Sequence, residues 1–193
     1  MKLEKLPPIV RTFIALDTPA ELKEVIAKLQ RDLSRIPGAK VTWPKMDGIH
    51  LTLKFLGDVE GKQIPALIGA MQDCVKPFRP TELKTTHTGG FPNLQRPRVL
   101  WLGLESTTEL MSLQSIVEKT CFEFGFPLEE KAFHPHLTVG RVKEIERGCA
   151  LNEQFERAQI KPIIWTVSNI KIMSSELRQS GAIYEVLGTA SFN

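Results

Sequence analysis

A four-residue pattern occurs twice in this chain of 193 residues. His-Leu-Thr-Leu spans residues 50–53 and His-Leu-Thr-Val spans residues 136–139. Both copies lie in apolar stretches typical of β-strands, in which alternate side chains point to opposite faces. In each copy the histidine and the threonine should therefore share one face, while the leucine between them points into the core. The chain has four histidines, and two of them occupy the same strand context.

The similarity between the two halves extends beyond these motifs. An apolar run opens each half, at 9–16 and at 99–104, and an amphipathic helix pattern follows it before the motif. The order strand, helix, HxTx strand thus recurs at a nearly constant offset. We interpret this as an internal duplication within a single domain, 1–193, with repeats of about 1–95 and 96–193.

The segments outside these units are less regular. The alternation of residues predicts strands at 82–87, 163–173 and 182–187, with a bulge or bend near Asn169. The Pro/Gly-rich stretch 88–98 is a candidate crossover between the repeats.

Composition narrows the class of protein. The formal net charge of +3 is too small to imply nucleic-acid binding by itself. The three cysteines are an odd number, which favours free thiols in a reducing cytoplasm over a disulfide framework. No apolar run reaches the roughly 20 residues of a membrane span, and the N-terminus lacks a signal-peptide pattern. We therefore expect a cytoplasmic protein.

Bringing the two motifs together across one groove would place two imidazoles beside two hydroxyls. Hydroxyl donors with a nearby cation suit a tetrahedral anion. One histidine would take a proton from water while the other protonates the departing oxygen, which opens a ribose 2′,3′-cyclic phosphate without a metal. Strict alternation places Lys54 on the face of His50. Arg141 falls on the wrong face, unless the strand ends or twists at Gly140.

Taken together, these motifs resemble the 2H phosphoesterase superfamily and, within it, the LigT-like RNA 2′,3′-cyclic phosphodiesterases, also called 2′-5′ RNA ligases. The resemblance covers nearly the whole chain, and paired HxTx motifs are specific to it. The matching segments are 12–16, 50–57, 90–92, 97–103 and 135–141, together with Tyr184.

The resemblance implies an α+β, bilobal, pseudo-two-fold fold in which two antiparallel sheets flank a central cleft and helices pack outside. It implies hydrolysis of RNA 2′,3′-cyclic phosphate ends to 2′-phosphomonoesters, without a metal or other cofactor. By position, His50 matches the proton donor and His136 the acceptor. Thr52 and Thr138 match phosphate-contacting hydroxyls, and Arg141 matches a phosphate-binding arginine. The residues alone do not distinguish the two histidines.

Further candidates surround the motifs. Lys54 is either a phosphate contact or an ordinary surface charge. Phe91 and Trp43 lie in loop-like settings, where they stack on a base or pack against a core or lid. His134 shares strand parity with His136 and either lines the groove or is structural. A zinc site at these two histidines would need a further protein ligand, and no cysteine or acidic cluster is spaced to supply one.

Two alternatives stay open from the sequence. The same residues would serve a phosphodiesterase for a small cyclic nucleotide, an ADP-ribose cyclic phosphate or a 2′-5′ oligoadenylate. An RNA-end-binding module without turnover is the alternative from another class. We expect a monomer that acts on RNA ends, with no membrane partner, and any ligase activity on 2′-5′ junctions would be the weak reverse reaction.

Overall fold

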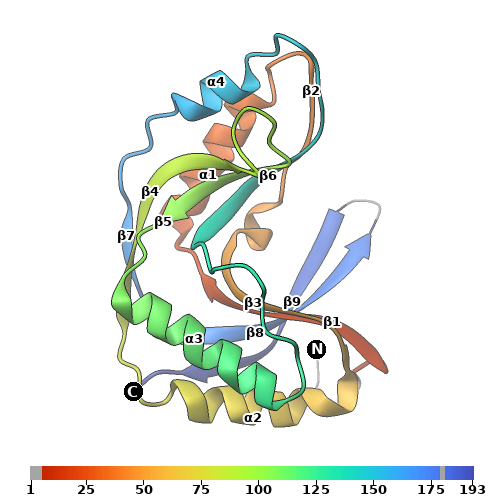
Figure 1. Ribbon diagram of the computed structural model, residues 1–193, viewed down its shortest axis with the longest axis vertical. Helices are drawn as coiled ribbons and strands as arrows, with labels where there is room; N and C mark the ends of the chain where they lie inside the picture. The colour runs from red at the N-terminus through yellow and green to blue at the C-terminus, as the bar shows by residue number, and fades with distance from the viewer. Residues whose placement is uncertain (1–5, 179–180) are drawn as a thin grey trace.

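The computed structural model describes residues 6–178 and 181–193. In this part of the chain nine strands form a strongly curled antiparallel sheet, with four α-helices packed around it (Figure 1). The strands are β1 (Ile9–Asp17), β2 (Ala39–Thr42), β3 (His50–Glu60), β4 (Thr81–Phe91), β5 (Val99–Leu104), β6 (His136–Ile145), β7 (Ile164–Val167), β8 (Asn169–Arg178) and β9 (Gly181–Ser191). The helices are α1 (Ala20–Leu33), α2 (Ile64–Val75), α3 (Thr108–Glu123) and α4 (Leu151–Glu156).

The sheet has two parts that meet at one residue pair. Its order is β7-β4-β5-β6-β3-β1-β8-β9, and β2 pairs with β6 beside this path. Within the described residues, Leu51 of β3 and Leu137 of β6 form the single pair that joins the two parts. We call the part from β3 to β9 the first sheet and the part from β6 to β7, with β2, the second sheet. The expected α+β fold is confirmed, and its two expected sheets are continuous through this pair.

The two halves of the sequence interleave in the fold. Strand β4 comes from the first half but pairs with β5 and β7 of the second sheet. Strands β8 and β9 come from the second half but complete the first sheet through β1. The helices follow the same exchange, because α1 contacts β6 and α4 whereas α3 contacts β3 and α2. Figure 1 accordingly shows α1 beside β4–β6, with α2 and α3 along the first sheet.

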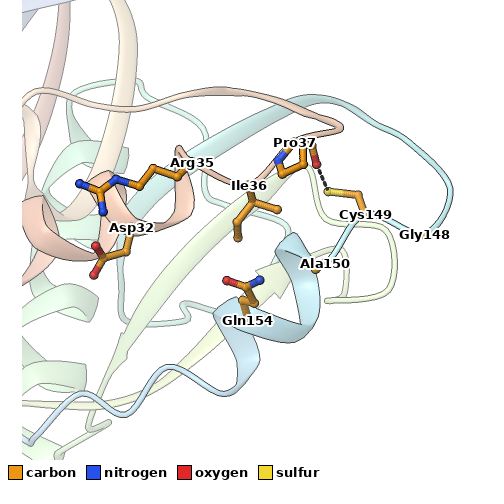
Figure 2. A pocket seen from close by; sticks show the side chains of 8 residues that line it. All are labelled: Asp32, Arg35, Ile36, Pro37, Gly148, Cys149, Ala150 and Gln154. Carbon is orange, nitrogen blue, oxygen red and sulfur yellow. Dashed lines mark hydrogen bonds between the residues drawn. The ribbon is translucent and has the colours of Figure 1, made fainter.

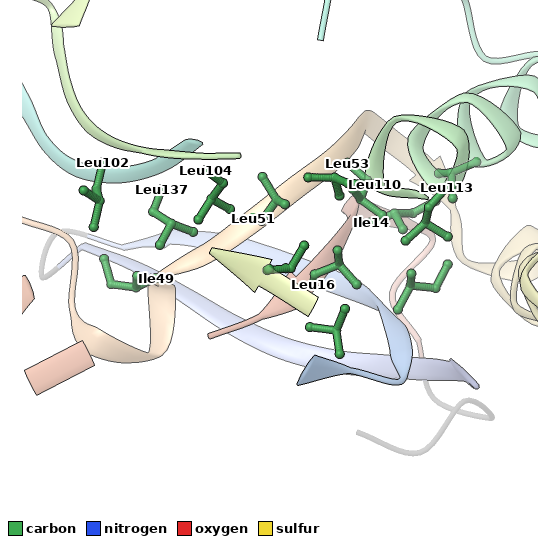
Figure 3. Packing of buried hydrophobic residues seen from close by; sticks show 14 of the residues in the cluster. Ile14, Leu16, Ile49, Leu51, Leu53, Leu102, Leu104, Leu110, Leu113 and Leu137 are labelled. Atoms are coloured by element: carbon green, nitrogen blue, oxygen red, sulfur yellow. The ribbon is translucent and has the colours of Figure 1, made fainter. Parts of the chain in front are cut away.

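One apolar core runs behind both sheets. Figure 3 shows Leu102 and Leu137 at one end, Ile14 and Leu16 at the other, and Leu51 between them. All five side chains are almost fully buried. Burying a leucine or isoleucine side chain contributes about 1.5–3 kcal/mol, so the register of both motif strands is strongly fixed. The leucines of the two motifs face this core, and the histidines face away from it.

Both motif strands carry a β-bulge directly after the motif threonine. In β3 the register with β1 skips Leu53, and in β6 the register with β5 skips Val139. The two bulges occupy equivalent positions, 86 residues apart. Because a bulge adds one residue to one strand, side chains beyond it point to the opposite face from the one that strict alternation predicts.

The remaining strand expectations are largely met. The predicted strand at 163–173 is divided near Asn169, as expected, because β7 pairs with β4 whereas β8 pairs with β1. The stretch 88–98 is not a crossover between the repeats. Its first residues, including Gly89 and Gly90, lie in β4, and the rest turns directly into β5. Among the described residues, every helix is too short or too polar to cross a bilayer.

Candidate active site

His50 and His136 begin β3 and β6, on either side of the pair that joins the two sheets. Antiparallel pairing of Leu51 with Leu137 places His50 opposite Thr138 and His136 opposite Thr52, all on one face. Diagonal neighbours in such a pair lie about 7–8 Å apart. His50 and His136 are such diagonal neighbours, so their side chains stand on either side of the Leu51–Leu137 pair. We call this surface the histidine face.

Arg141 also lies on the histidine face, because the bulge at Val139 reverses the alternation of β6. Its side chain is exposed, while its neighbours Gly140 and Val142 are buried. The positive charge of Arg141 lowers the pKa values of both His50 and His136, after the larger effect of burial, as a charge on the same face does. The sequence argument required an end or twist at the glycine, but the structure achieves the same result one residue earlier.

The placement of Lys54 on the histidine face is wrong. The bulge at Leu53 turns the side chain of Lys54 to the core side, where it is 2% exposed. Its ammonium donates to Glu118 Oε1 at 2.7 Å and to the carbonyl oxygen of Pro127 at 2.6 Å. Lys54 is therefore an internal ion-pair residue and not a candidate for phosphate contact.

Trp43 is likewise not on the histidine face. A Cβ atom built on Gly140 would lie 2.8 Å from the ring of Trp43, so the indole packs directly over this glycine. Gly140 points away from Arg141 and toward the core side, where Trp43 is half-buried. The second alternative for Trp43, packing against the core, is the one that the structure supports.

The His50 ring is enclosed by aromatic residues of the first sheet. The ring of Phe13, on β1, stacks on it with centroids 4.7 Å apart and planes at 26°. Tyr184, on β9, contacts it edge-on at 5.4 Å. The Nδ1 atom is buried, and no described residue lies within hydrogen-bond reach of it. A proton on Nδ1 would have no acceptor, so the proton of the neutral ring belongs on Nε2.

This enclosure makes His50 difficult to protonate. Burial lowers the pKa of His50 from 6.5 to about 4, because the charged imidazolium loses its hydration. Asp17, directly opposite on β1, raises this pKa. Lys23 and Arg141 lower it further.

His136 has a different environment. Its Nδ1 lies 2.7 Å from the carbonyl oxygen of His134, and a carbonyl can only accept. The neutral ring therefore carries its proton on Nδ1, which leaves the lone pair on Nε2. Burial again lowers the pKa of His136, the hydrogen bond to His134 raises it, and the charges of His134 and Arg141 lower it.

The expected neighbours Phe91 and His134 do lie beside His136. The centroid of the Phe91 ring is 5.0 Å from that of His136 and 5.5 Å from that of His134, edge-on in both cases. His134 is exposed and its ring centroid is 6.3 Å from that of His136. Three of the five secondary candidates, Arg141, Phe91 and His134, therefore reach the histidine face, whereas Lys54 and Trp43 do not.

Trp101 also reaches the histidine face, although it lies in a continuous apolar strand that would suggest a place in the core. It is 6% exposed, but it pairs with Thr138 and therefore lies on the histidine face. Its ring contacts that of His134 at a centroid distance of 4.8 Å. A Cβ atom on Gly89 would lie 2.2 Å from this ring, so the neighbouring strand must carry glycine there. A glycine pair inside a strand was the signal that could have revealed the close approach.

A separate hollow of about 410 Å³ lies away from both histidines, between the end of α1 and the start of α4. Figure 2 shows its lining, in which Cys149 Sγ donates to the carbonyl oxygen of Pro37 at 3.2 Å. None of the predicted site residues lines it. Within residues 6–178 and 181–193, no three His, Cys, Asp or Glu side chains are grouped to hold a metal ion.

A curled antiparallel sheet with two HxTx strands meeting at its centre defines a phosphoesterase of the 2H class. The sequence model of the family "LigT like Phosphoesterase" matches residues 16–101 and, a second time, residues 102–184. The chain belongs to this family, which confirms the resemblance and the expectation of a hydrolytic enzyme.

Relatives of known name agree with this assignment. The RNA 2′,3′-cyclic phosphodiesterase of Thermotoga maritima is 36% identical over 187 residues, which is 95% of this chain and 96% of that protein. The enzyme of the same name from Methanothermobacter thermautotrophicus is 32% identical over 91% of this chain and 95% of its own length.

Solved structures show the same fold at lower sequence identity. A Thermus thermophilus protein matches with a TM-score of 0.77 and 24% identity, over 94% of this chain and 97% of its own. Escherichia coli LigT, crystallised with 3′-AMP, matches with a TM-score of 0.74 and 24% identity, over 96% and 99% of the two chains.

Proposed function

We propose that this protein opens RNA 2′,3′-cyclic phosphate ends to 2′-phosphomonoesters, with His50 as proton donor and His136 as proton acceptor. The observation that carries the proposal is the pair of imidazoles that flank Leu51 and Leu137 on one face, with opposite arrangements at Nδ1. The names of the relatives, which share most of the chain's length, support RNA ends as the substrate.

His136 is the better base of the two. Its Nδ1–H is committed to the His134 carbonyl, so Nε2 offers its lone pair to a water molecule on the histidine face. As water attacks phosphorus, its proton passes to this Nε2. The imidazolium that forms keeps the same carbonyl as an acceptor for Nδ1–H, which favours the charged product of the transfer.

His50 acts from the other side of the phosphorus atom. Its low pKa keeps it neutral in the free protein at pH 7. A bound phosphate anion raises this pKa, because a nearby opposite charge favours the imidazolium. The ring then takes up a second proton from solvent, and the imidazolium donates the Nε2 proton to the ribose 3′ oxygen as the bond between phosphorus and that oxygen breaks. Attack and departure are in line, which requires the two rings on opposite sides of the phosphoryl group.

The phosphate itself is held by Thr52, Thr138 and Arg141. The two hydroxyls lie opposite the two histidines, and the guanidinium lies near both rings. A hydroxyl donates one hydrogen bond and an arginine offers a planar fork, so the three groups together neutralise the charge that develops on the non-bridging oxygens. Phe91 and His134 line the His136 side of this site. No step requires a metal or an organic cofactor.

The direct test is incubation of the folded protein, with excess chelator, with a short RNA that ends in a 2′,3′-cyclic phosphate. We expect conversion to a 2′-phosphate end, which a general phosphomonoesterase removes, unlike the cyclic end, and which a 3′-specific phosphatase leaves in place, unlike a 3′-phosphate. A matched RNA with a 3′-phosphate end is the control and should not change. Retention of the cyclic end by the folded protein would falsify the proposal. Tight binding of that RNA without turnover would identify the protein instead as an RNA-end-binding module.

A substrate panel separates RNA ends from small molecules. The panel compares kcat/KM for the RNA with that for a mononucleotide 2′,3′-cyclic phosphate, an ADP-ribose cyclic phosphate and a 2′-5′ oligoadenylate. We expect the RNA to be the best substrate.

A further inference from the structure

We propose that each motif strand positions the histidine of the other: Lys54, on the strand of His50, holds the segment that leads to His136, and Gln30 with Gly140 holds the segment that leads to His50. These groups are positioning residues and do not contact the substrate. The proposal rests on the proposed function for its catalytic meaning, but the geometry and its test stand without turnover.

The first of these anchors centres on the buried ammonium of Lys54. Its two closest acceptors are Glu118 Oε1 at 2.7 Å, on α3, and the Pro127 carbonyl at 2.6 Å. Glu129 Oε1 is a weaker third partner at 3.5 Å. Pro127 and Glu129 belong to the segment 124–135, which has no helix or strand and which contains the His134 carbonyl that accepts from His136 Nδ1.

Glu118 completes this anchor. Its Oε1 atom also accepts from the backbone N–H of Glu129 at 2.7 Å, so one carboxylate joins α3, β3 and the segment. The side chain of Glu118 is 14% exposed and that of Lys54 is 2% exposed, so water screens this pair weakly. Removing either partner would leave the other charge buried, and the segment would lose its tie to β3.

The second anchor has the same arrangement, but it is made by an amide and an aromatic ring and not by an ion pair. The segment 43–49 leads from β2 to His50, and its first residue, Trp43, packs over Gly140 of β6. Gln30 of α1 donates from Nε2 to the Pro44 carbonyl at 3.1 Å and to the Val139 carbonyl at 2.9 Å. One buried amide thus joins α1, β6 and the segment.

The equivalence of the two anchors is visible in the numbering. Gly140 follows Lys54 by 86 residues, and Glu129 follows Trp43 by the same interval. Both strand positions come directly after a bulge. The bulge in β6 therefore brings position 141 to the histidine face. In both strands the bulge also turns the next residue, position 54 in β3 or position 140 in β6, toward the segment that enters from the other half.

This arrangement predicts that each change disturbs the histidine that its anchor holds, whichever histidine is nearer in the sequence. A change at Lys54, four residues after His50, should disturb His136 and spare His50. A change at Gln30, in the first half of the chain, should disturb His50 and spare His136. A merely structural role would loosen both histidines together or neither.

The test is a pH titration of the two imidazoles by ¹⁵N NMR in the full-length protein, with resonances assigned through His50→Gln and His136→Gln. The variants are Lys54→Met and Gln30→Met, which keep side-chain length and remove the polar head. Lys62→Met is the matched control, because Lys62 is a lysine with an 82% exposed side chain beyond the end of β3. Glu118→Gln is a second variant in case Lys54→Met does not fold.

In the Lys54 variant we expect His136 to lose its single Nδ1–H tautomer and populate both, while the pKa of His50 stays where it is in the parent. In the Gln30 variant we expect the pKa of His50 to rise toward 6.5, because burial is what lowers it, while the tautomer of His136 is unchanged. The groups that set these baselines are Asp17, Lys23 and Arg141 around His50, and His134 and Arg141 around His136. None of them is altered.

The opposite pattern, with Lys54→Met acting on His50 alone, overturns the proposal, as does a joint change of both rings in either variant. Turnover of the cyclic phosphate is measured in parallel. We expect kcat to fall at least tenfold in Lys54→Met with KM nearly constant, because the base is misoriented while the phosphate contacts remain. If the parent has no activity, the proposed function fails, whereas the crossed titration pattern still decides the positioning.

Discussion

The two copies of HxTx differ most in what surrounds their histidines. His50 is stacked on Phe13 and has a buried Nδ1 without an acceptor among the described residues. His136 has an aromatic ring at its edge, and its Nδ1 is fixed on a backbone carbonyl. The difference is supplied by neighbouring strands and loops that show little sequence similarity. In the proposed mechanism, two identical triplets thus take an acid and a base role that their surroundings set, as carboxylates do in other active sites.

The largest effect that can break this comparison comes from the histidines themselves. We expect His50→Ala and His136→Ala each to reduce kcat by about 10²–10⁴-fold on an RNA cyclic phosphate. With sulfur in place of the 3′ oxygen the leaving group needs no proton, so His50→Ala should recover most of its activity while His136→Ala should not. Single-turnover rates on the two substrates measure this.

Circular dichroism of both variants is the control for folding. Recovery of the His136 variant in place of the His50 variant would reverse the assignment of donor and acceptor.

The second effect is on stability. His50 has a pKa of about 4 in the folded protein and 6.5 in the unfolded chain, so the unfolded chain binds more protons between these values. Its contribution to stability is complete above pH 6.5 and is lost as pH falls to 4. The loss is about 3 kcal/mol. Urea unfolding between pH 4 and 7 should therefore show a shallower pH dependence for His50→Phe than for the parent. If the free energy of unfolding depends on pH in the same way in both proteins, the pKa of His50 is not lowered in the native state.

Arg141 is the group that the two histidines share. Removing its charge in Arg141→Gln should raise the pKa values of both rings, because the charge lowers both. It should also reduce kcat by roughly 10²-fold, as loss of an oxyanion donor does. NMR titration and steady-state kinetics test the two parts. Lys143→Gln, an exposed change two residues along the same strand, is the control. A shift confined to one histidine would place the guanidinium on one side of the site.

The smallest effect should come from Phe13→Leu. The substitution keeps an apolar side chain under His50 but removes the stacked ring, so water gains access to the imidazole. The pKa of His50 should rise toward its ordinary value of 6.5, because burial is what lowers it, at a stability cost below about 1.5 kcal/mol. An unchanged pKa of His50 would mean that Phe13 does not enclose the ring. Phe91→Leu is the matched variant beside His136, and it shows whether the pKa of that histidine depends on its aromatic neighbour.

Much of the site could be predicted from the sequence, because it depends on local periodicity. The strands of His50 and His136, the shared face of each histidine with its threonine, and the burial of Leu51 and Leu137 all follow from alternation within a few residues. The helices that follow β1 and β5 were predicted from equally local periodicity, and Thr107 accepts from the backbone N–H of Leu110 at the start of α3.

The errors share one cause. Lys54 was misplaced because the bulge at Leu53 reverses the face of β3, and a bulge depends on the register with a neighbouring strand. The contact of Trp101 with His134 was not predicted, because it requires β5 to lie beside β6 with Gly89 behind it. Pairing between distant segments is what a single sequence does not show.

The exchange of strands between the halves has a consequence for how this chain is made. Strand β1 is synthesised long before β8, which pairs one of its edges. During translation that edge of β1 therefore stays unpaired until β8 has left the ribosome. Non-local pairing of this kind slows folding and leaves a nascent chain open to association with other chains. The first sheet should accordingly be the last part of the protein to become protected after synthesis.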